Sequence, residues 1–332
     1  MIGPAMSVVI PTYNRASRLR MCLQSILAAH LEDIEIVVVD DGSTDETAAI
    51  VRSLGADIQY IARENGGPSA ARNTGIRASR GRYVAFFDSD DLMLRGMRHE
   101  CVKWLDANPD ISVVFMDAYV ESSGARSRAF AADQRRLSRL WAVPSVERGQ
   151  FRVFDREAFF AAMVLDKCYL IPSLAIVRRS ALEAEACFDE RLRGYEEWDL
   201  FARLAAKHAF AFVQEPGAII VKHDSNLSGD LEAMDMQGTS ILQKFLAGAI
   251  PLSPEQRKGV EEKLVATMFN VSHAAFQRGD HRTARTRFRS LIARGGLRPA
   301  YGAYWCATWL TPQQMHRLRN IREQLTLRRS AR

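Results

Sequence analysis

The 332-residue sequence contains no hydrophobic run of the roughly 20 residues that a membrane-spanning helix requires. Its longest weakly polar segment, from Pro299 to Leu310, has twelve residues. The first residues, MIGPAMSVVIP, lack the basic segment that precedes the apolar part of a signal peptide, so this stretch is better interpreted as a strand. We therefore expect a cytoplasmic protein, either free or peripheral at the inner face of the membrane.

Three further absences exclude common classes of site. The five cysteines are scattered and never form a CxxC pair, which argues against a disulfide framework and against a zinc site. The turn after the first predicted strand reads PTYNR, without the GxGxxG of dinucleotide-binding dehydrogenases. The chain also lacks the GxxxxGK[S/T] motif of P-loop nucleotide hydrolases.

The net charge of +6 is distributed unevenly. Residues 278–332 contain thirteen Lys or Arg and two acids, a balance of +11, so residues 1–277 sum to −5. Such a basic tail predicts contact with an anionic membrane or a pyrophosphate-bearing acceptor. A solvated helical face, a lid and a dimer element are the alternatives. Aromatic residues beside arginines favour the membrane: Tyr304, Trp305, Trp309, Arg317, Arg319 and Arg322. No nucleic-acid reader motif accompanies the charge, so nucleic acid is not an expected partner.

The first 230 residues alternate between strand and helix patterns. Strands are expected where Val, Ile and aromatic residues form short continuous runs, at Ser7–Pro11, Glu35–Asp40, Ile58–Ile61 and Tyr83–Asp88. Amphipathic stripes lie between them, an order that implies parallel strands with right-handed crossovers. We predict one α/β domain over residues 1–230, with a Rossmann-like, mostly parallel central sheet flanked by helices. Residues 231–332 should form an α-helical, basic C-terminal region.

Local signals refine this outline. Ser43-Thr44-Asp45-Glu46 matches a capping box, with Ser43 as the N-cap of a helix that runs to about Leu54. Periodicity weakens over residues 119–167, and two short strands are expected at 210–213 and 218–221. The segment 274–295 is typical of a helix hairpin that turns at Gly279-Asp280.

An acidic cluster, Asp88-Ser89-Asp90-Asp91, directly follows the fourth predicted strand. Three carboxylates within four residues repel one another unless a cation or hydrogen-bond donors compensate their charge. Oxygen ligands of this kind suit Mg²⁺ or Mn²⁺ with open positions for phosphate. An acidic loop with an aspartate helix cap is the alternative, and Asp91 fits the role of a cap better than that of a ligand.

Other polar groups follow the neighbouring strands, and ligands of open parallel sheets bind at the carboxyl ends of the strands. Asp40 and Asp41 follow the second strand, where a carboxylate can accept from a ribose hydroxyl or a base N–H, or simply shape a turn. Arg72 lies on the first turn of a helix that should start near Pro68-Ser69 after a glycine-rich loop, where it can face a phosphate or the aspartates.

Acids also gather in the segment Gly194–Asp199, at the start of a predicted helix. Acids at a helix N-terminus are favoured by the helix dipole alone. A carboxylate that deprotonates an acceptor hydroxyl is the functional alternative. His223 is a lone histidine that could bind a metal or a phosphate.

The order of these motifs resembles family 2 glycosyltransferases with a GT-A fold. The matching segments are SVVIPTYNR, EIVVVDDGSTDET, ENGGPSAARNTGI, YVAFFDSDD, FDERLRGYEEWDLFARLA and VKHDSNLS, within residues 6–230. The resemblance implies inverting transfer of a sugar from a nucleotide-diphosphate sugar, most often UDP-linked, to a hydroxyl of a glycan or lipid-linked acceptor, as in cell-surface polysaccharide biosynthesis. It also implies Mn²⁺ or Mg²⁺ as cofactor and an acceptor-side portion at about residues 119–230.

Residue roles follow from the same resemblance. Nucleotide-binding residues would be Pro11, Thr12, Tyr13, Arg15, Asp41, Arg72 and Asp88. Asp90 would bind the metal, with Asp88 and His223 as further ligands. The family usually has Glu-Asp before Trp-Asp, with that Asp as the catalytic base, whereas this sequence has Glu196-Glu197. Glu197 is therefore the expected base, and Glu196 and Asp199 are the other candidates. A catalytically impaired sugar-nucleotide-binding protein and a nucleotidyltransferase remain as alternatives.

Overall fold

The computed structural model describes residues 3–55, 57–122, 124–128, 137–185, 187–223, 231–296, 298–310 and 314. The chain separates into two compact units. The first combines Met1–Gly229 with Gly248–Gln256, and the second combines Asp230–Ala247 with Arg257–Arg332. The domain boundary at residue 230 stays a prediction, because compactness by itself does not test independent folding.

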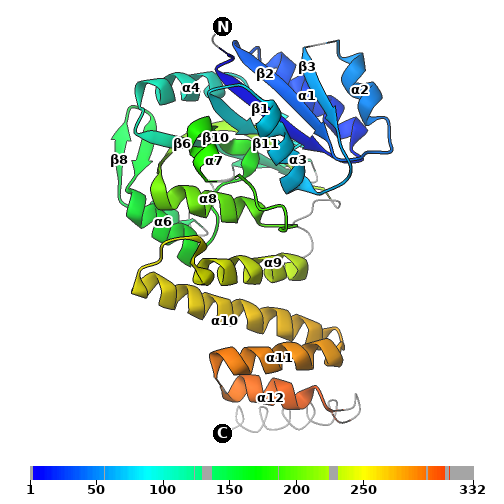
Figure 1. Cartoon of the computed structure of the whole chain (residues 1–332), viewed down its shortest axis with the longest axis vertical. Coiled ribbons are helices and arrows are strands. Elements are labelled where there is room, and N and C mark those ends of the chain that lie inside the picture. Colours follow the sequence, from blue (N-terminus) through cyan, green and yellow to red (C-terminus); the bar gives the residue numbers. More distant parts are fainter. Residues whose placement is uncertain are drawn as a thin grey trace. The chain divides into compact units, whose positions relative to one another are not determined.

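The first unit is built on one mixed sheet with strand order β3-β2-β1-β4-β10-β6-β11-β9-β8 (Figure 1). Strands β1 to β4 are mutually parallel, with bounds Met6–Thr12, Ile34–Asp40, Ile58–Ala62 and Tyr83–Phe86. β6 (Ile111–Ser122) and β11 (Ala209–Val221) form a second parallel pair. β10 (Ala175–Arg178) lies antiparallel between β4 and β6. The predicted α/β class with a central, helix-flanked sheet is confirmed.

Helices connect and cover these strands: α1 Ala16–Ala28, α2 Thr47–Ser53, α3 Pro68–Ala78, α4 Met97–Ala107, α5 Ser138–Trp141, α6 Arg156–Leu165, the 3₁₀ turn η1 Pro172–Leu174, α7 Arg179–Ala184 and α8 Glu196–Lys207. The amphipathic stripe of α1 buries Leu19, Cys22, Leu23 and Ile26, as its spacing predicts. α3 lies close against the sheet, since a Cβ on Gly75 would come within 2.3 Å of Val9 Cγ1.

The structure corrects several local predictions. α2 begins at Thr47, and its N-cap position is Glu46, without a capping hydrogen bond from the Glu46 side chain. Asp45, one residue earlier, accepts from the Thr47 N–H at 3.0 Å through its Oδ1. Ser43 instead accepts from the Asn14 N–H at 2.8 Å, because β1 and β2 bring their following loops together. The weakly periodic stretch contains β7 Ala125–Arg128 and the hairpin β8 Ser145–Arg148 and β9 Phe151–Phe154.

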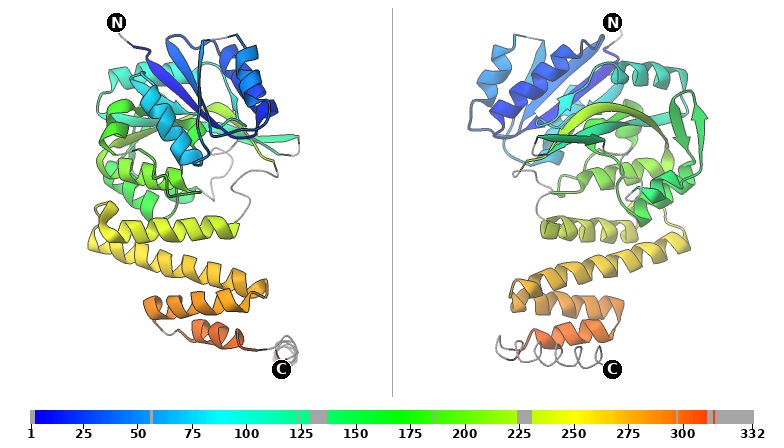
Figure 2. Two further views of the ribbon diagram at one scale, coloured as in Figure 1. Left: turned by 45° about the vertical axis from the view of Figure 1, so that its right-hand side comes forward. Right: turned by 180° about the vertical axis from the view of Figure 1, so that it is seen from behind.

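Two predicted short strands form one strand, β11, whose register shifts at Val213, Pro216 and Ala218. These irregularities bend β11 strongly, as the rear view in Figure 2 shows. The bend lets the second half of β11 pair with β5 (Leu92–Met93) beside the acidic loop.

The second unit is helical: α9 Leu231–Lys244, the π-helical turn η3 Phe245–Ala249, α10 Pro254–Gln277, α11 His281–Gly295 and α12 Pro299–Ala307. The predicted hairpin turn is confirmed, with Gly279 at φ +80° and Asp280 Oδ1 accepting from the Thr283 N–H at 3.1 Å. Aromatic side chains fill its core, including Phe288 stacked on Tyr304 at 5.7 Å.

None of the helices in the described part of the chain has the length and apolar character needed to cross a bilayer. Of the basic residues singled out above, Arg317, Arg319 and Arg322 lie outside the described residues.

Candidate active site

The candidate site lies at the carboxyl ends of β1, β2 and β4. β1 is the central strand of the three, and Thr12 at its end pairs with Asp40 at the end of β2. The loop after β1 reaches the loop after β4, where Arg15 Nη1 binds Asp90 Oδ2 at 2.5 Å. The strand-end clusters therefore meet through direct contacts.

The carboxylates of the acidic loop have different partners. Asp90 Oδ2 also contacts His223 Nε2 at 2.8 Å, which brings the end of β11 to the loop. Asp91 is buried, where it accepts from Ser173 Oγ at 2.6 Å and from the Val221 N–H at 3.2 Å. Burial, and then the negative charges of Asp88 and Asp90, raise the pKa of Asp91 well above its usual value.

Asp91 does not cap a helix, and that expectation is wrong. The next residues form β5, and α4 begins only at Met97. Asp91 instead fixes the loop to η1 and β11 through Ser173 and Val221. Of the other two carboxylates, Asp88 is partly exposed, with 28% of its side chain accessible, whereas Asp90 is buried.

The two aspartates after β2 shape the neighbouring loops. Asp40 accepts from the Ser43 N–H at 2.8 Å and from the Tyr60 hydroxyl at 2.5 Å. Asp41 accepts from the Gly67 N–H at 2.7 Å and also binds Arg63. Asp41 therefore holds the glycine-rich loop against the sheet.

Arg72 connects two parts of the site. Its Nη2 binds Asp88 Oδ1 at 2.7 Å, and its Nη1 binds Glu196 Oε1 at 2.6 Å. Although burial lowers the pKa of Arg72, the charges of Asp88 and Glu196 raise it above its usual value. The guanidinium thus joins the end of β4 to the start of α8.

The first turn of α8 carries the three acids that the sequence indicates. Tyr195 precedes it in the left-handed region at φ +54°. Burial, followed by repulsion from Glu196, raises the pKa of Glu197 to about 8, while its side chain keeps some exposure. Asp199 is fully buried and binds Arg203 at 2.9 Å.

The loop after β1 presents the remaining predicted nucleotide ligands. Pro11 is partly exposed, Thr12 is buried, and Tyr13 is 49% exposed. Asn14 takes φ +50° and accepts from the Thr44 N–H at 2.8 Å, which fixes the loop beside Tyr13. An exposed aromatic ring on an anchored loop can stack on a flat ligand.

Sequence reasoning missed three residues that support this geometry. Arg63 binds Asp41, and its position at a strand end is a signal that could have found it. Ser173 donates to Asp91 and accepts from the Asp88 N–H at 3.0 Å, with no distinctive sequence signal. Arg98 is fully buried and donates to backbone carbonyls of Ser173 and Gly217 beneath the acidic loop.

This architecture is that of the GT-A glycosyltransferases. Staphylococcus aureus TarS in complex with UDP-GlcNAc superposes with a TM-score of 0.62 at 18% identity, over 90% of this chain and 83% of that chain. The mannosyltransferase PcManGT from Pyrobaculum calidifontis, in complex with GDP-Man and Mn²⁺, gives a TM-score of 0.56 at 20% identity, over 95% and 83%. The predicted GT-A fold is confirmed.

The family follows from the sequence. The model of Glycosyl transferase family 2 matches residues 7–184, more than half of the 332-residue chain. The chain therefore belongs to glycosyl transferase family 2, as its motifs indicate.

Curated relatives agree. An uncharacterized glycosyltransferase, RT0329 of Rickettsia typhi, is 29% identical over 252 residues, 73% of each chain. EpsJ of Bacillus subtilis, also an uncharacterized glycosyltransferase, is 36% identical over 127 residues, 37% of each chain. A Campylobacter jejuni GalNAc(5)-diNAcBac-PP-undecaprenol beta-1,3-glucosyltransferase is 34% identical over 133 residues, 39% of this chain and 42% of the relative. This chain thus spans less than half the length of the last two relatives.

Proposed function

We propose that this protein is an inverting glycosyltransferase, which moves a sugar from a nucleotide-diphosphate sugar to a hydroxyl of a glycan or lipid-linked acceptor. The observation that carries the proposal is the bridge made by Arg72 between Asp88 and Glu196. This bridge places the buried guanidinium of Arg72 between the acidic loop after β4 and the first turn of α8, which holds Glu197. Donor and acceptor chemistry need these two groups side by side.

Glu197 is the proposed base. Its raised pKa of about 8 makes it a stronger base than an ordinary carboxylate once it is ionised. It takes the proton of the acceptor hydroxyl, whose oxygen forms a bond to the anomeric carbon of the donor. The bond from that carbon to the diphosphate oxygen breaks, and the electron pair leaves with the diphosphate. Glu196 is held by Arg72 and Asp199 by Arg203, which favours Glu197 among the three acids.

A divalent cation fits the acidic loop as a cofactor. In the described residues, no group of three or more His, Cys, Asp or Glu surrounds a single point. Mn²⁺ or Mg²⁺ needs only one or two protein carboxylates when phosphate oxygens and water complete its shell. Asp90 and His223 already meet at 2.8 Å, and Asp88 lies two residues before Asp90 in the same loop. When bound, the cation would neutralise charge on the leaving diphosphate.

The nucleotide half of the donor would lie on the loops after β1 and β2. Tyr13 offers an exposed ring for the base, and Pro11, Thr12 and Asp41 line the same strand ends. Arg15 already compensates Asp90 and would reach the diphosphate from the same loop. The two solved neighbours are complexes with UDP-GlcNAc and with GDP-Man, and we propose a UDP-sugar for this chain.

Release of nucleoside diphosphate tests the function. We expect the protein to release UDP from at least one of a panel of UDP-, GDP- and dTDP-sugars, faster with Mn²⁺ and not after chelation by EDTA. A nucleotidyltransferase would release pyrophosphate from a nucleoside triphosphate instead. Donor binding in a thermal-shift assay without turnover, for every donor and acceptor, would identify a catalytically impaired binding protein.

The basic C-terminal region supports peripheral contact with an anionic membrane as part of the proposal. Arg282 and Arg289 are both exposed on α11. We expect Arg282→Glu with Arg289→Glu to reduce co-sedimentation with vesicles that contain anionic lipid, since each basic residue near such a surface contributes about 1 kcal/mol. Equal sedimentation of wild type and variant would contradict membrane contact through this helix.

A further inference from the structure

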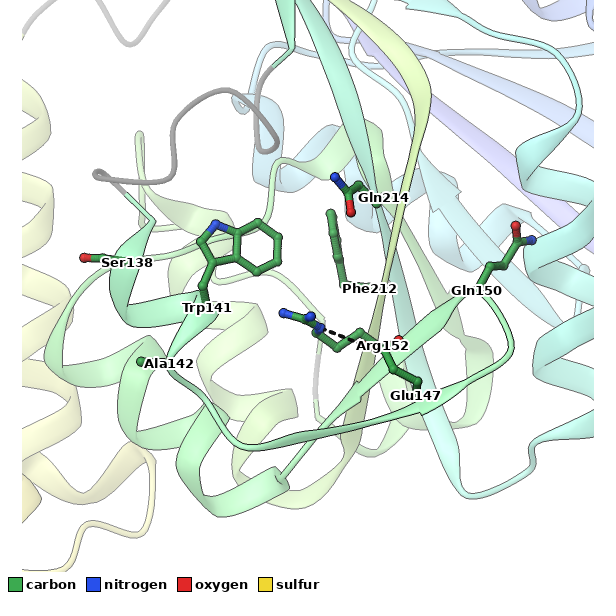
Figure 3. A pocket seen from close by; sticks show the side chains of 8 residues that line it. All are labelled: Ser138, Trp141, Ala142, Glu147, Gln150, Arg152, Phe212 and Gln214. Atoms are coloured by element: carbon green, nitrogen blue, oxygen red, sulfur yellow. Dashed lines mark hydrogen bonds and ion pairs between the residues drawn. The ribbon is translucent and has the colours of Figure 1, made fainter.

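A pocket of about 630 Å³ lies outside the strand-end site. Its lining combines two aromatic rings, two carboxamides and one ion pair: Trp141, Phe212, Gln150, Gln214, Glu147 and Arg152. In Figure 3, Trp141 of α5 and Arg152 of the β8–β9 hairpin lie beside Phe212 of β11. Gln150, at the turn of the hairpin, lies at the far edge and points away from the rings. The three elements are brought together by pairing of β9 with both β8 and β11.

The rings are held in place. Trp141 and Phe212 pack at 65° with centroids 5.4 Å apart, and the Arg152 guanidinium lies 5.4 Å from the centroid of Trp141. Phe212 is buried and also packs against Phe115 in the core. A pocket wall of fixed rings offers apolar surface without a large loss of side-chain freedom on binding.

The polar groups of the pocket are electrically balanced. Arg152 Nε binds Glu147 Oε1 at 3.0 Å, so the one cation among the described residues that line the pocket is paired. Gln150 and Gln214 are exposed, and each carboxamide provides donors and an acceptor. Such a pocket suits a neutral ligand with many hydroxyl groups and an apolar C–H face. It suits phosphate poorly, because the guanidinium is already paired, and it suits a lipid chain poorly, because the carboxamides would lose water without compensation.

The pocket shares structural elements with the proposed active site. Gln214 and His223 belong to β11 and its immediate end, nine residues apart, which is at most about 30 Å along a strand. Phe212 contacts Phe115, and Phe115 contacts Phe159 of α6. α6 in turn accepts a hydrogen bond at Met163 O from Trp198 of α8, at 2.7 Å. A chain of several sugars is long enough to occupy the pocket and the proposed active site at the same time.

We propose that this pocket is a distal subsite for the acceptor, which binds one neutral pyranoside unit of a glycan several units from the hydroxyl that reacts. The inference rests on the proposed function. The ring of Trp141, supported from behind by the buried Phe212, contacts the C–H face of the sugar. Gln150, Gln214 and the Glu147–Arg152 pair bind its hydroxyls. The subsite makes the protein favour an oligosaccharide acceptor over a monosaccharide.

Direct binding of neutral linear hexasaccharides tests the subsite without any need for turnover. Cellohexaose, chitohexaose, laminarihexaose and maltohexaose would be titrated into the full chain, with tryptophan fluorescence and calorimetry as readouts. We expect saturable binding of at least one hexasaccharide and tenfold or weaker binding of its monosaccharide. Trp141→Ala, and separately Gln150→Ala with Gln214→Ala, should each weaken that binding at least tenfold. The second variant changes only exposed side chains, so it guards against a folding defect of the first.

Trp309→Ala is the matched control, because Trp309 is an exposed tryptophan that also packs on an arginine, Arg285. It should bind the hexasaccharide as wild type does. The subsite is overturned if none of the four sugars binds saturably, or if both pocket variants bind as wild type does. Release of nucleoside diphosphate from the donor in water should be unchanged in the pocket variants. Hexasaccharide binding that depends on Trp141, in a protein that turns over no donor, would retain the subsite and reject the proposed function.

Discussion

Replacing Glu197 with glutamine is expected to reduce sugar transfer by about 10²–10⁴-fold, the usual contribution of a positioned general base. Glutamine keeps the shape of the side chain but cannot accept the proton of the acceptor hydroxyl. Donor binding, measured by thermal shift, should stay close to wild type because Arg72, Asp88 and Asp90 are unchanged. Glu183→Gln on α7 is the control, since Glu183 is exposed. Transfer at the wild-type rate by Glu197→Gln would reject Glu197 as the base.

The pH dependence of sugar transfer also tests Glu197 as the base. The base must be ionised, so kcat/KM of the wild type should rise with pH until it levels off above the pKa of Glu197, which is about 8. This rising limb should be absent from the residual activity of Glu197→Gln.

The free energy of unfolding should fall with rising pH, whereas kcat/KM should rise. The folded protein holds the proton of Glu197 more tightly than the unfolded chain does, so wild-type stability should fall as pH rises from about 4.5 to about 8. The glutamine variant lacks this loss and should be more stable above pH 8, by on the order of a few kcal/mol. Urea unfolding at pH 5 and pH 9 measures the difference.

Arg72→Met should be the most damaging substitution for both folding and activity. It removes the partner of Asp88 and of Glu196, and an uncompensated buried charge costs about 3–5 kcal/mol. Transfer should also fall by about 10²–10³-fold, because a fixed donor beside the leaving group is lost. Urea unfolding and nucleoside diphosphate release measure the two effects.

Two variants separate charge from geometry at this position. Arg72→Lys keeps the positive charge but cannot hold two carboxylates with one planar group, so we expect partial recovery of stability and little recovery of activity. Arg82→Met is the control, since its ion pair with Asp106 is exposed and should contribute less than about 1 kcal/mol. An Arg72→Met variant as stable as Arg82→Met would show that the bridge is unimportant for folding.

The parallel half of the sheet was predictable because its strands are short, apolar and separated by helices of regular period. The polar groups at its strand ends could be located from the same pattern. The antiparallel β10 could not, since nothing in its composition distinguishes it from a parallel strand buried on both faces. The hairpin β8–β9 was missed because β8 is exposed and carries no alternating pattern.

Within the site, residue types were predictable but partners were not. Arg72 and Glu196 are 124 positions apart, and Arg15 and Asp90 are 75 apart, so only the fold decides that they meet. The error at Ser43 has the same origin. The position of Ser43 fits the local capping pattern. In the structure, however, its hydroxyl accepts a hydrogen bond from the Asn14 N–H in the loop after β1.

The bridge made by Arg72 would also couple the proposed donor and acceptor sites electrostatically. Asp88 contributes to the raised pKa of Glu197, together with the larger effects of burial and Glu196. A divalent cation bound beside Asp88 would offset this contribution and lower the pKa of Glu197, whereas the diphosphate of the donor would act in the opposite direction. In the proposed mechanism, binding of the cation together with the donor would then increase the ionised fraction of Glu197. In the pH titration described above, kcat should then rise at a lower pH than kcat/KM does. Charge alone would impose an order of events, with the donor first and the proton transfer second.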